Sequence, residues 1–284
     1  MTVAAERLAV RRQPGVLARL LRFARGHLLT VFAMLAFAYL LLPIAVVVVF
    51  SFNDPTGRFN LTWQGFTLAN WANPFGFPGV QDAVEVSIEI AALSSVVATA
   101  LGTLIALSLV RYHFRGSGIT NLLIFLPMAT PEIVMGSSLL TLFLNFGIPL
   151  GFKTILLAHI MFNISYVVVT VKARLVGFDR HLEEAAMDLG ANEWTTFTRV
   201  TLPLIAPGIL AAALLAFALS VDDFVITYLN SGSVVTFPLF VWGAARVAIP
   251  PQINVIGSAI FFVAVLLMLA NVALQWRRQP KGAV

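Results

Sequence analysis

The sequence of 284 residues contains no cysteine, which excludes disulfide bonds, thiolate metal ligands and cysteine nucleophiles. Charged residues are also scarce: they make up 11% of the chain, against about 25% in ordinary soluble domains. Hydrophobic residues make up 59%, well above the roughly 45–50% of such domains. This balance excludes an ordinary soluble globular protein and indicates a chain that lies mostly within a membrane.

Motifs typical of enzymes are missing as well. No Gly-x-x-x-x-Gly-Lys-Ser/Thr phosphate loop occurs, so the chain is not expected to bind or hydrolyse ATP by itself. The four histidines are scattered, at His27, His113, His159 and His181, and do not suggest a metal site. No nucleophile elbow or catalytic triad is discernible. The sequence therefore predicts a chain that is not an enzyme and that binds no cofactor or metal of its own.

Long apolar runs with few charges dominate the sequence instead. A helix needs roughly 20 apolar residues to cross the hydrocarbon core of a bilayer. The predicted spans are residues 28–51, 83–110, 119–145, 153–172, 208–229 and 252–275. The segment 230–251 is apolar but broken by glycine and proline, and we interpret it as an external loop with a short interfacial helix over 239–247. We therefore expect an all-α polytopic membrane protein with six transmembrane helices.

The basic residues gather on one side of this arrangement. Fifteen of the 18 lysines and arginines fall on one side, and only Arg58, Lys153 and Arg246 fall on the other. The positive-inside rule then places both termini, the basic arm 1–27 and the basic tail 276–284, in the cytoplasm. The net charge of +5 is thus explained by topology and anionic lipid rather than by nucleic acid.

Two segments that flank the first span allow more than one interpretation. The arginine-rich arm superficially resembles a secretory signal, but the apolar run behind it exceeds the roughly 7–15 residues of a signal, so we expect an uncleaved span. The external loop 52–82 is rich in turn residues and contains Trp63 and Trp71. It is either a packed cap with tryptophans at the membrane interface or a docking surface for an external partner.

The longest predicted cytoplasmic loop, 173–207, has a helical pattern. An apolar stripe at helical spacing contains Leu182, Ala185, Ala186 and Leu189. Gly190 is expected to end this first helix and Asn192 to cap a second one, which Leu202-Pro203 closes. The pattern predicts a helix-turn-helix suited to a groove on another protein, although a hairpin that braces the ends of the bundle stays an alternative.

The spacing in this loop resembles the EAA loop of the permease subunits of bacterial ABC importers. The matching positions are Glu184-Ala185-Ala186, Gly190, Val200 and Leu202-Pro203, with valine where isoleucine is usual. In that family the loop is a coupling helix that docks into a cleft of the cytoplasmic ATPase. The residues to which the resemblance gives this role are Glu184, Ala185, Ala186, Asp188, Gly190, Leu202 and Pro203.

The resemblance also implies a fold and partners. The implied fold is the MetI-like fold of type I ABC importer permeases, with a five-helix core over 83–275. The implied partners are two ATPase subunits that bind ATP and Mg, an extracytoplasmic substrate-binding protein, and a second, different permease subunit. The chain is then expected in the bacterial inner membrane, with ATP hydrolysis confined to the partners.

A second resemblance is to the spermidine/putrescine importer permeases. It rests on Ser220-Val221-Asp222-Asp223-Phe224-Val225-Ile226 in the fifth span and on the segment from Pro127 to Val134 in the third. It is strongest from Val80 to Ala273 and implies import of a cationic solute, a polyamine. Related permeases for other small solutes share this scaffold, so another small substrate stays an alternative.

Ionisable side chains inside the predicted spans are costly, so each needs a partner or a function. The rise of a helix places Glu89, Glu132, His159 and Asp222 in one acidic layer in the outer third of the membrane. This layer predicts a vestibule that attracts a cation, with aromatic walls. The predicted substrate-path residues are Asp222, Asp223, Glu132, Glu89, Phe224, Tyr228 and His159.

Structural roles compete with this interpretation at several positions. His159 begins a polar stripe that could join helices rather than bind substrate. Asp222 and Asp223 point in different directions on a helix, so we expect one to face the path and the other to bond to a neighbouring helix. A purely structural ion pair of either aspartate with Arg246 is a further alternative. For the chain as a whole, the rival hypotheses are a stand-alone secondary transporter and a membrane scaffold.

Overall fold

The computed structural model describes residues 16–112 and 114–278. Side chains are described for residues 26–112, 114–266, 269 and 270. The first fifteen residues of the predicted basic arm and the last six of the predicted tail lie outside this part of the chain.

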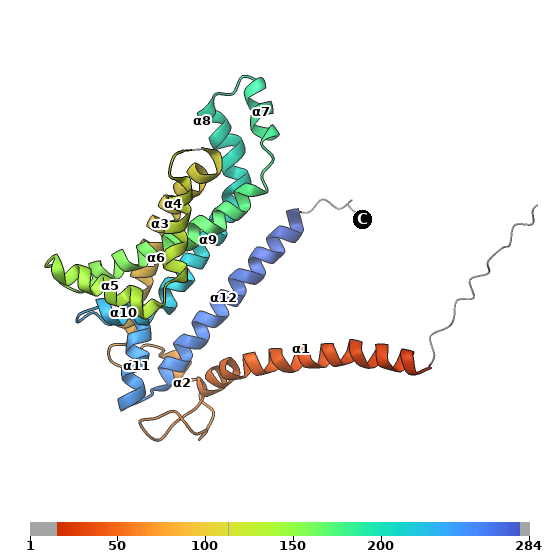
Figure 1. Ribbon diagram of the computed structural model, residues 1–284. Helices are drawn as coiled ribbons and strands as arrows, with labels where there is room; N and C mark the ends of the chain where they lie inside the picture. Colours follow the sequence, from red (N-terminus) through yellow and green to blue (C-terminus); the bar gives the residue numbers. More distant parts are fainter. Residues whose placement is uncertain (1–15, 113, 279–284) are drawn as a thin grey trace, which may run out of the picture.

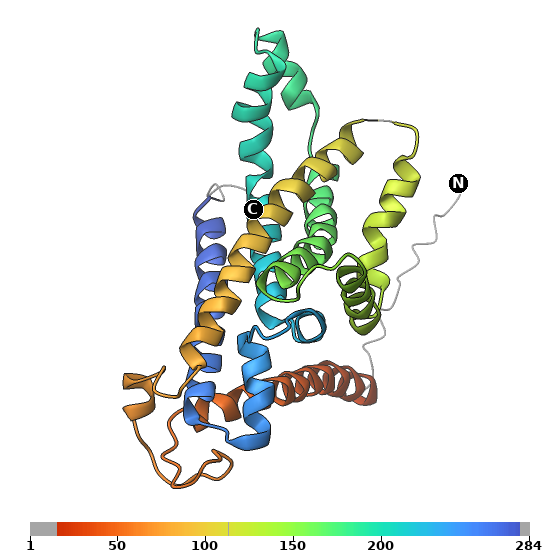
Figure 2. The ribbon, with the colours of Figure 1, turned by 90° about the vertical axis from the view of Figure 1, so that its left-hand side faces the viewer.

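The described chain is built of helices, which confirms the predicted all-α class. In chain order they are α1 (Val16–Phe50), α2 (Ala69–Ala72), α3 (Val80–Arg111), α4 (Ser117–Ala129), α5 (Glu132–Asn145), α6 (Phe152–Val176), α7 (His181–Asp188), α8 (Glu193–Thr196), α9 (Leu202–Asp222), α10 (Val225–Asn230), α11 (Phe237–Val247) and α12 (Pro251–Arg278). A π-helical turn, Phe197–Thr201, joins α8 to α9. The α7–α8 hairpin lies at one end of the molecule, and α2 and α11 lie at the other (Figures 1 and 2).

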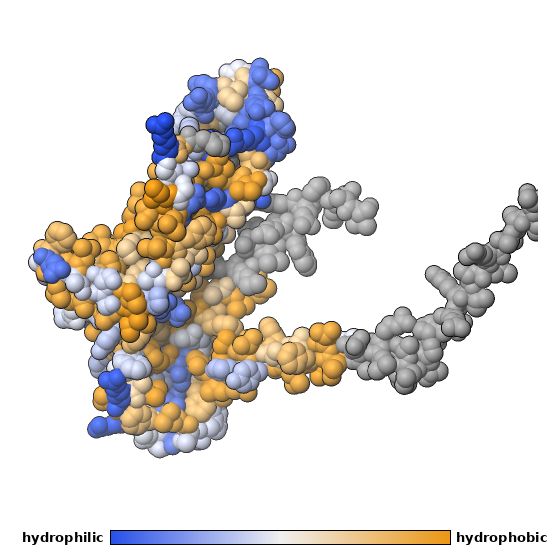
Figure 3. All heavy atoms as spheres, viewed as in Figure 1, coloured by the Kyte–Doolittle hydropathy of each residue, from blue (hydrophilic) through white to orange (hydrophobic). Residues whose placement is uncertain are grey.

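Several of these helices have the length and apolar composition of membrane-spanning helices. Within the described residues, four stretches are long and apolar enough to cross it: Gly26–Phe50, Val80–Arg111, Phe152–Val176 and Glu193–Asp222. The bent pair of α4 and α5 makes a fifth if it counts as one span. Apolar side chains cover much of the surface between the two polar ends (Figure 3). A polytopic membrane protein is confirmed, whereas the count of six spans and the cytoplasmic termini stay predictions.

The core of the bundle is the packing of α3, α6 and α9. Small residues let the backbones of membrane helices approach closely, and α3 supplies several of them. The closest approach is at Gly102, where an added Cβ would lie 2.6 Å from Cγ1 of Val167 and 2.8 Å from its Cβ. The core residues buried around this contact are Ala98, Ala106, Val167, Val168, Val171, Ile205, Ala212 and Ala216.

Substitution of Gly102 by alanine is expected to destabilise the bundle by about 1–3 kcal/mol, because the added methyl group overpacks the α3–α6 contact. The measurement is the apparent melting temperature of the detergent-purified protein. The matched control is Gly118→Ala in α4, where the new methyl group meets nothing within 4 Å and removes only glycine's helix penalty. Equal melting temperatures for the two variants would contradict the close approach.

The predicted third and fifth spans, 119–145 and 208–229, are each interrupted by a break between two helices. The α4 and α5 helices meet at an angle of 107°. Thr130 is extended there, as expected before Pro131, because the proline ring disfavours a helical conformation of the preceding residue. The second break follows α9, where Asp223 is extended with ψ of 123° before α10 begins.

The predicted end of the second loop helix at Leu202-Pro203 was wrong. The stretch Glu193–Asp222 is one helix of 30 residues, and Pro203 lies inside it. The wide π turn explains why the proline is tolerated. Leu202 donates its N–H to the carbonyl of Phe197, which is one residue further back than in an α-helix. Pro203, which has no N–H to donate, therefore follows directly after the point where the hydrogen-bond pattern of the helix already changes.

The segment between α1 and α3 is a packed cap, as one of the two interpretations of the 52–82 loop expected. Asn53 is completely buried and donates to the Asn60 side chain at 2.6 Å and to the Thr62 carbonyl at 2.8 Å. Phe52 stacks on Phe66 and Trp71, with 5.6 Å between ring centroids in each case. The helix expected over 239–247 is confirmed as α11.

Candidate functional site

The hairpin of α7 and α8 has the caps that the sequence predicts. Gly190 ends α7 with a φ of +92°, a conformation that glycine adopts without steric cost. Its N–H bonds to the Met187 carbonyl at 2.9 Å. Asn192 then accepts the N–H of Thr195 at 2.8 Å and so caps α8. The turn of the hairpin is therefore set by local sequence.

The apolar side chains of the hairpin are exposed. Leu189 and Trp194 are 91% and 72% exposed, and Leu182 and Met187 are also accessible. The chain itself does not cover these side chains, so the hairpin does not use them to brace the bundle. An accessible apolar surface of this kind is suited to binding a groove on another protein.

A polar clasp, formed by Arg111, Glu183 and Thr201, holds α7 to the bundle. Arg111 ends α3 and forms an ion pair with Glu183, which also accepts the hydroxyl of Thr201. Arg111 donates to Thr201 at 3.3 Å as well, and Arg180 donates to the Val110 carbonyl at 2.8 Å. Sequence analysis missed this clasp, because Arg111 and Glu183 are 72 residues apart.

An outer ion pair on α7 is less important. Nδ1 of His181 lies 3.2 Å from the Glu184 carboxylate, and both side chains are exposed. The hydrogen bond to Glu184, together with the charge of Asp179, raises the pKa of His181 above its ordinary value. Because exposed pairs are screened by water and salt, this contact adds little to stability.

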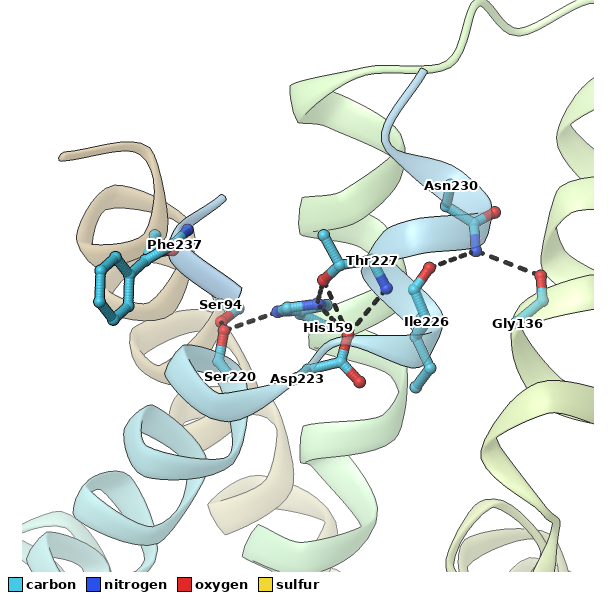
Figure 4. A network of polar contacts seen from close by, with 10 residues as sticks. Ser94, Gly136, His159, Ser220, Asp223, Ile226, Thr227, Asn230 and Phe237 are labelled. Carbon is cyan, nitrogen blue, oxygen red and sulfur yellow. Dashed lines mark hydrogen bonds and ion pairs between the residues drawn. The ribbon is translucent and has the colours of Figure 1, made fainter. Parts of the chain in front are cut away.

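The second candidate region is the break between α9 and α10, where a buried network lies (Figure 4). Asp223 accepts the backbone N–H of Thr227 at 2.8 Å and its hydroxyl at 2.7 Å. Nε2 of His159 lies 3.0 Å from the Thr227 hydroxyl and 3.3 Å from the Asp223 carboxylate. Nδ1 of His159 lies 2.6 Å from Ser220, which also bonds to Ser94 of α3 at 3.1 Å.

This network explains why the chain breaks here. The Asp223 carboxylate takes up an N–H of the first turn of α10, which otherwise has no partner inside that short helix. His159 of α6 then joins the end of α9 to the start of α10. The side chains of His159 and Asp223 are only 1% and 5% exposed. The network thus sets the direction in which α10 leaves α9.

The α10 helix is also held at its far end. Asn230 is buried and donates to the carbonyls of Gly136 in α5, at 3.1 Å, and Ile226, at 2.9 Å. An added Cβ at Gly136 would lie 2.9 Å from Cδ1 of Leu229, so α5 and α10 are in close contact. These contacts position the short helix against α5.

The predicted path residues therefore separate into two groups. His159 and Asp223 are buried in the network, as the helix-joining hypothesis for His159 expected, and Asp223 is the aspartate that bonds to a neighbouring helix. Glu89, Glu132 and Asp222 are exposed, and none of them forms an ion pair within the described part of the chain.

Aromatic side chains lie next to this break. Phe224 stacks on Tyr228 with centroids 5.6 Å apart and packs against Trp242 of α11 at 5.3 Å. The guanidinium carbon of Arg246 lies 4.8 Å from the centre of the Trp242 ring. The alternative of an ion pair between Arg246 and either aspartate was thus wrong, because Arg246 packs on an aromatic face instead. Trp242 was missed, although its spacing of four residues from Arg246 in an expected helix is a usable signal.

The comparison with known families decides the class of protein. Residues 98–277 match the family described as binding-protein-dependent transport system inner membrane component. The chain belongs to this family. It is accordingly a multi-pass permease of the inner membrane and the non-catalytic component of an ABC importer, and ATP binds to partner ATPase subunits. The predicted importer permease is confirmed.

Sequence alignments to individual related proteins cover most of the permease. It is 38% identical over 251 residues to the spermidine/putrescine transport system permease protein PotC of Escherichia coli K12, covering 88% of this chain and 93% of that protein. It is 37% identical over 238 residues to the putrescine transport system permease protein PotI of the same strain, covering 81% and 84%.

A solved structure supports the fold of the permease. A chain of a bacterial ABC transporter for import of the acidic polysaccharide alginate superposes with a TM-score of 0.65. The match covers 92% of this chain and 99% of that chain, at 15% identity. At this identity the similarity supports the shared architecture and carries no information on substrate.

Proposed function

We propose that this permease forms part of an inward path for a polyamine of the spermidine or putrescine class. The observation that carries the proposal is the exposed Asp222 carboxylate at the break between α9 and α10, two residues before Phe224, whose ring stacks on the exposed Tyr228. The names of the PotC and PotI relatives support the same substrate class. Glu89 and Glu132 are the further carboxylates of the proposed path.

The chemistry of a polyamine suits these groups. Each ammonium group loses part of its water shell inside a membrane, and this loss is costly unless an anion or aromatic face replaces the water. Exposed carboxylates supply the anions, and Tyr228, which is 59% exposed, supplies a ring face. In this proposal His159 and Asp223 act indirectly, because they hold α10 in position.

In the proposed importer, the α7–α8 hairpin is the part of the permease that faces the cytoplasmic ATPase. We propose that its exposed apolar side chains bind a cleft of the ATPase, with Glu184, Ala185, Ala186, Asp188 and Gly190 in the coupling segment. Leu202 and Pro203 then belong to the base of the hairpin, at the start of α9. The proposal includes six spans, cytoplasmic termini and a second permease subunit, which the resemblance to polyamine permeases suggests is a different chain.

The proposed substrate is tested by reconstitution of the permease with its partner subunits in proteoliposomes. Spermidine or putrescine is expected to stimulate ATP hydrolysis, whereas non-cationic solutes are not. Asp222→Asn should reduce spermidine uptake by about tenfold, because the path loses one exposed anion and a lost interaction of about 1.4 kcal/mol corresponds to a factor of ten. The matched control is Asp54→Asn in the external cap, where the carboxylate is exposed but far along the chain from the break.

Other outcomes would overturn the proposal. Stimulation only by an uncharged solute would assign another substrate to the same importer. Uptake by this chain alone, driven by an ion gradient, would establish a secondary transporter. Absence of stimulation by any solute, with all partners present, would favour a scaffold.

A further inference from the structure

The α11 helix lies over the outer end of the bundle and is attached to α3 by a few contacts. The N–H of Phe237 donates to the Ser87 hydroxyl at 2.8 Å, and the Phe240 ring packs edge-on against Phe77. None of the residues of α11 is buried. This helix therefore lies at the surface of the bundle, with Trp242 and Arg246 among its exposed residues.

One face of α11 completes an aromatic cluster of Phe224, Tyr228 and Trp242. The three rings are in series, with centroids 5.6 Å apart from Tyr228 to Phe224 and 5.3 Å apart from Phe224 to Trp242. Tyr228 and Trp242 are about half exposed. Phe224 between them is half-buried, and partly exposed aromatic rings in series are suited to binding a flat or cationic ligand.

An arginine of the protein itself already contacts one ring of this cluster, Trp242. The Arg246 guanidinium lies 4.8 Å from the centre of the Trp242 ring, within the distance of a cation–π contact. Within the described residues Arg246 has no carboxylate in an ion pair, so the ring is the identified partner of its charge. Because Arg246 is exposed, this contact is weak and can be exchanged.

The same ring face can bind a primary or secondary ammonium group. The attraction depends on the positive charge and on the ring quadrupole, which an alkylammonium satisfies as a guanidinium does. The methylene chain that joins two ammonium groups of a polyamine would pack on the neighbouring rings of Phe224 and Tyr228. The cluster thus fits a ligand with several cationic groups separated by short apolar linkers.

We propose that Trp242, Phe224 and Tyr228 form a binding site for a substrate ammonium group, and that Arg246 occupies this site until substrate displaces it. Arg246 then acts as a built-in competitor that keeps the aromatic face covered between transport events. The inference rests on the proposed polyamine path and adds to it Trp242 as a binding residue and Arg246 as a specificity-determining residue.

The test uses the complete transporter in proteoliposomes with its binding protein at fixed, saturating amount, and measures spermidine uptake against concentration. Arg246→Gln should lower the half-saturating concentration about two- to fivefold, since the competing cation is removed. Arg246→Lys keeps the cation and should stay near the wild-type value. Trp242→Leu should raise the half-saturating concentration, and Trp242→Phe, which keeps a ring, should raise it less.

A double variant separates competition at the ring from simple charge repulsion. In the Trp242→Leu background, Arg246→Gln should have no further effect, because there is no ring left to compete for. An equal decrease in both backgrounds would overturn the proposal and assign Arg246 a general electrostatic role. An unchanged half-saturating concentration in the single Arg246→Gln variant would overturn it too. If the wild-type complex takes up no spermidine, the proposed substrate itself has failed, which is a separate result.

Discussion

Replacing Gly190 by valine is expected to abolish ATP-coupled transport while the permease still inserts and assembles. The φ of +92° at this position is strongly disfavoured for a β-branched residue, at a cost of about 1–2 kcal/mol or more. Space is not the reason, since a Cβ at Gly190 meets nothing within 4 Å. The chain must therefore leave α7 along a different path, and the exposed apolar surface proposed to bind the ATPase changes shape.

The rest of the chain should tolerate this change. The clasp of Arg111, Glu183 and Thr201 holds α7 to the bundle on the side away from the turn. The measurements are ATP-driven uptake in proteoliposomes, basal ATP hydrolysis, and the amount of assembled complex. Gly190→Asn is the matched control, because asparagine adopts the left-handed conformation more readily, and it should retain much of the activity. Full transport by the valine variant would refute the coupling role of the turn.

Replacing Asp223 by alanine is expected to destabilise the permease, whereas the same change at its neighbour Asp222 is not. Loss of the Asp223 carboxylate leaves the buried N–H of Thr227 without its acceptor and leaves the Thr227 hydroxyl and Nε2 of His159 with only each other as partners. Each such group costs about 1–3 kcal/mol when it is left unsatisfied. The direction of α10 is lost as well, so uptake should fall together with stability.

The measurement is the apparent melting temperature of the detergent-purified complex, beside spermidine uptake. Asp223→Asn keeps one acceptor oxygen and should give an intermediate melting temperature. Asp222→Ala removes an exposed carboxylate and should reduce uptake with an unchanged melting temperature. If Asp223→Ala has wild-type stability and loses only uptake, Asp223 belongs to the path rather than to the network.

Local features of the molecule could be predicted from sequence, because they depend on neighbouring residues only. The turn at Gly190 and the cap at Asn192 follow from backbone sterics and from one side-chain acceptor. The helical apolar runs and the class of protein follow from composition and from the length needed to cross a bilayer. The pattern from Glu184 to Pro203 indicated an importer permease, because the whole motif lies in one contiguous stretch of sequence.

The two helix breaks show what the sequence alone does not specify: the angle of the first break and the position of the second. Pro131 indicated a break, but the angle of 107° between α4 and α5 depends on what packs against each half. At Asp223 nothing in the local pattern indicated a break, since the surrounding residues are apolar enough for one continuous span. The break depends on His159, a residue of α6 that lies 64 positions earlier in the chain.

Composition, apolar run length and the spacing of the α7–α8 loop by themselves determined that this protein is a helical membrane permease of an ABC importer, and they predicted a helical hairpin in that loop. Only the tertiary structure decided which of two adjacent aspartates is buried and which is exposed. Residues one apart on a helix point about 100° away from each other, and sequence does not say which direction faces α6. Tertiary structure likewise decided that Trp242 contacts Phe224, a residue 18 positions earlier in the chain, whereas the contact of Arg246 with Trp242 follows from their spacing of four residues on α11.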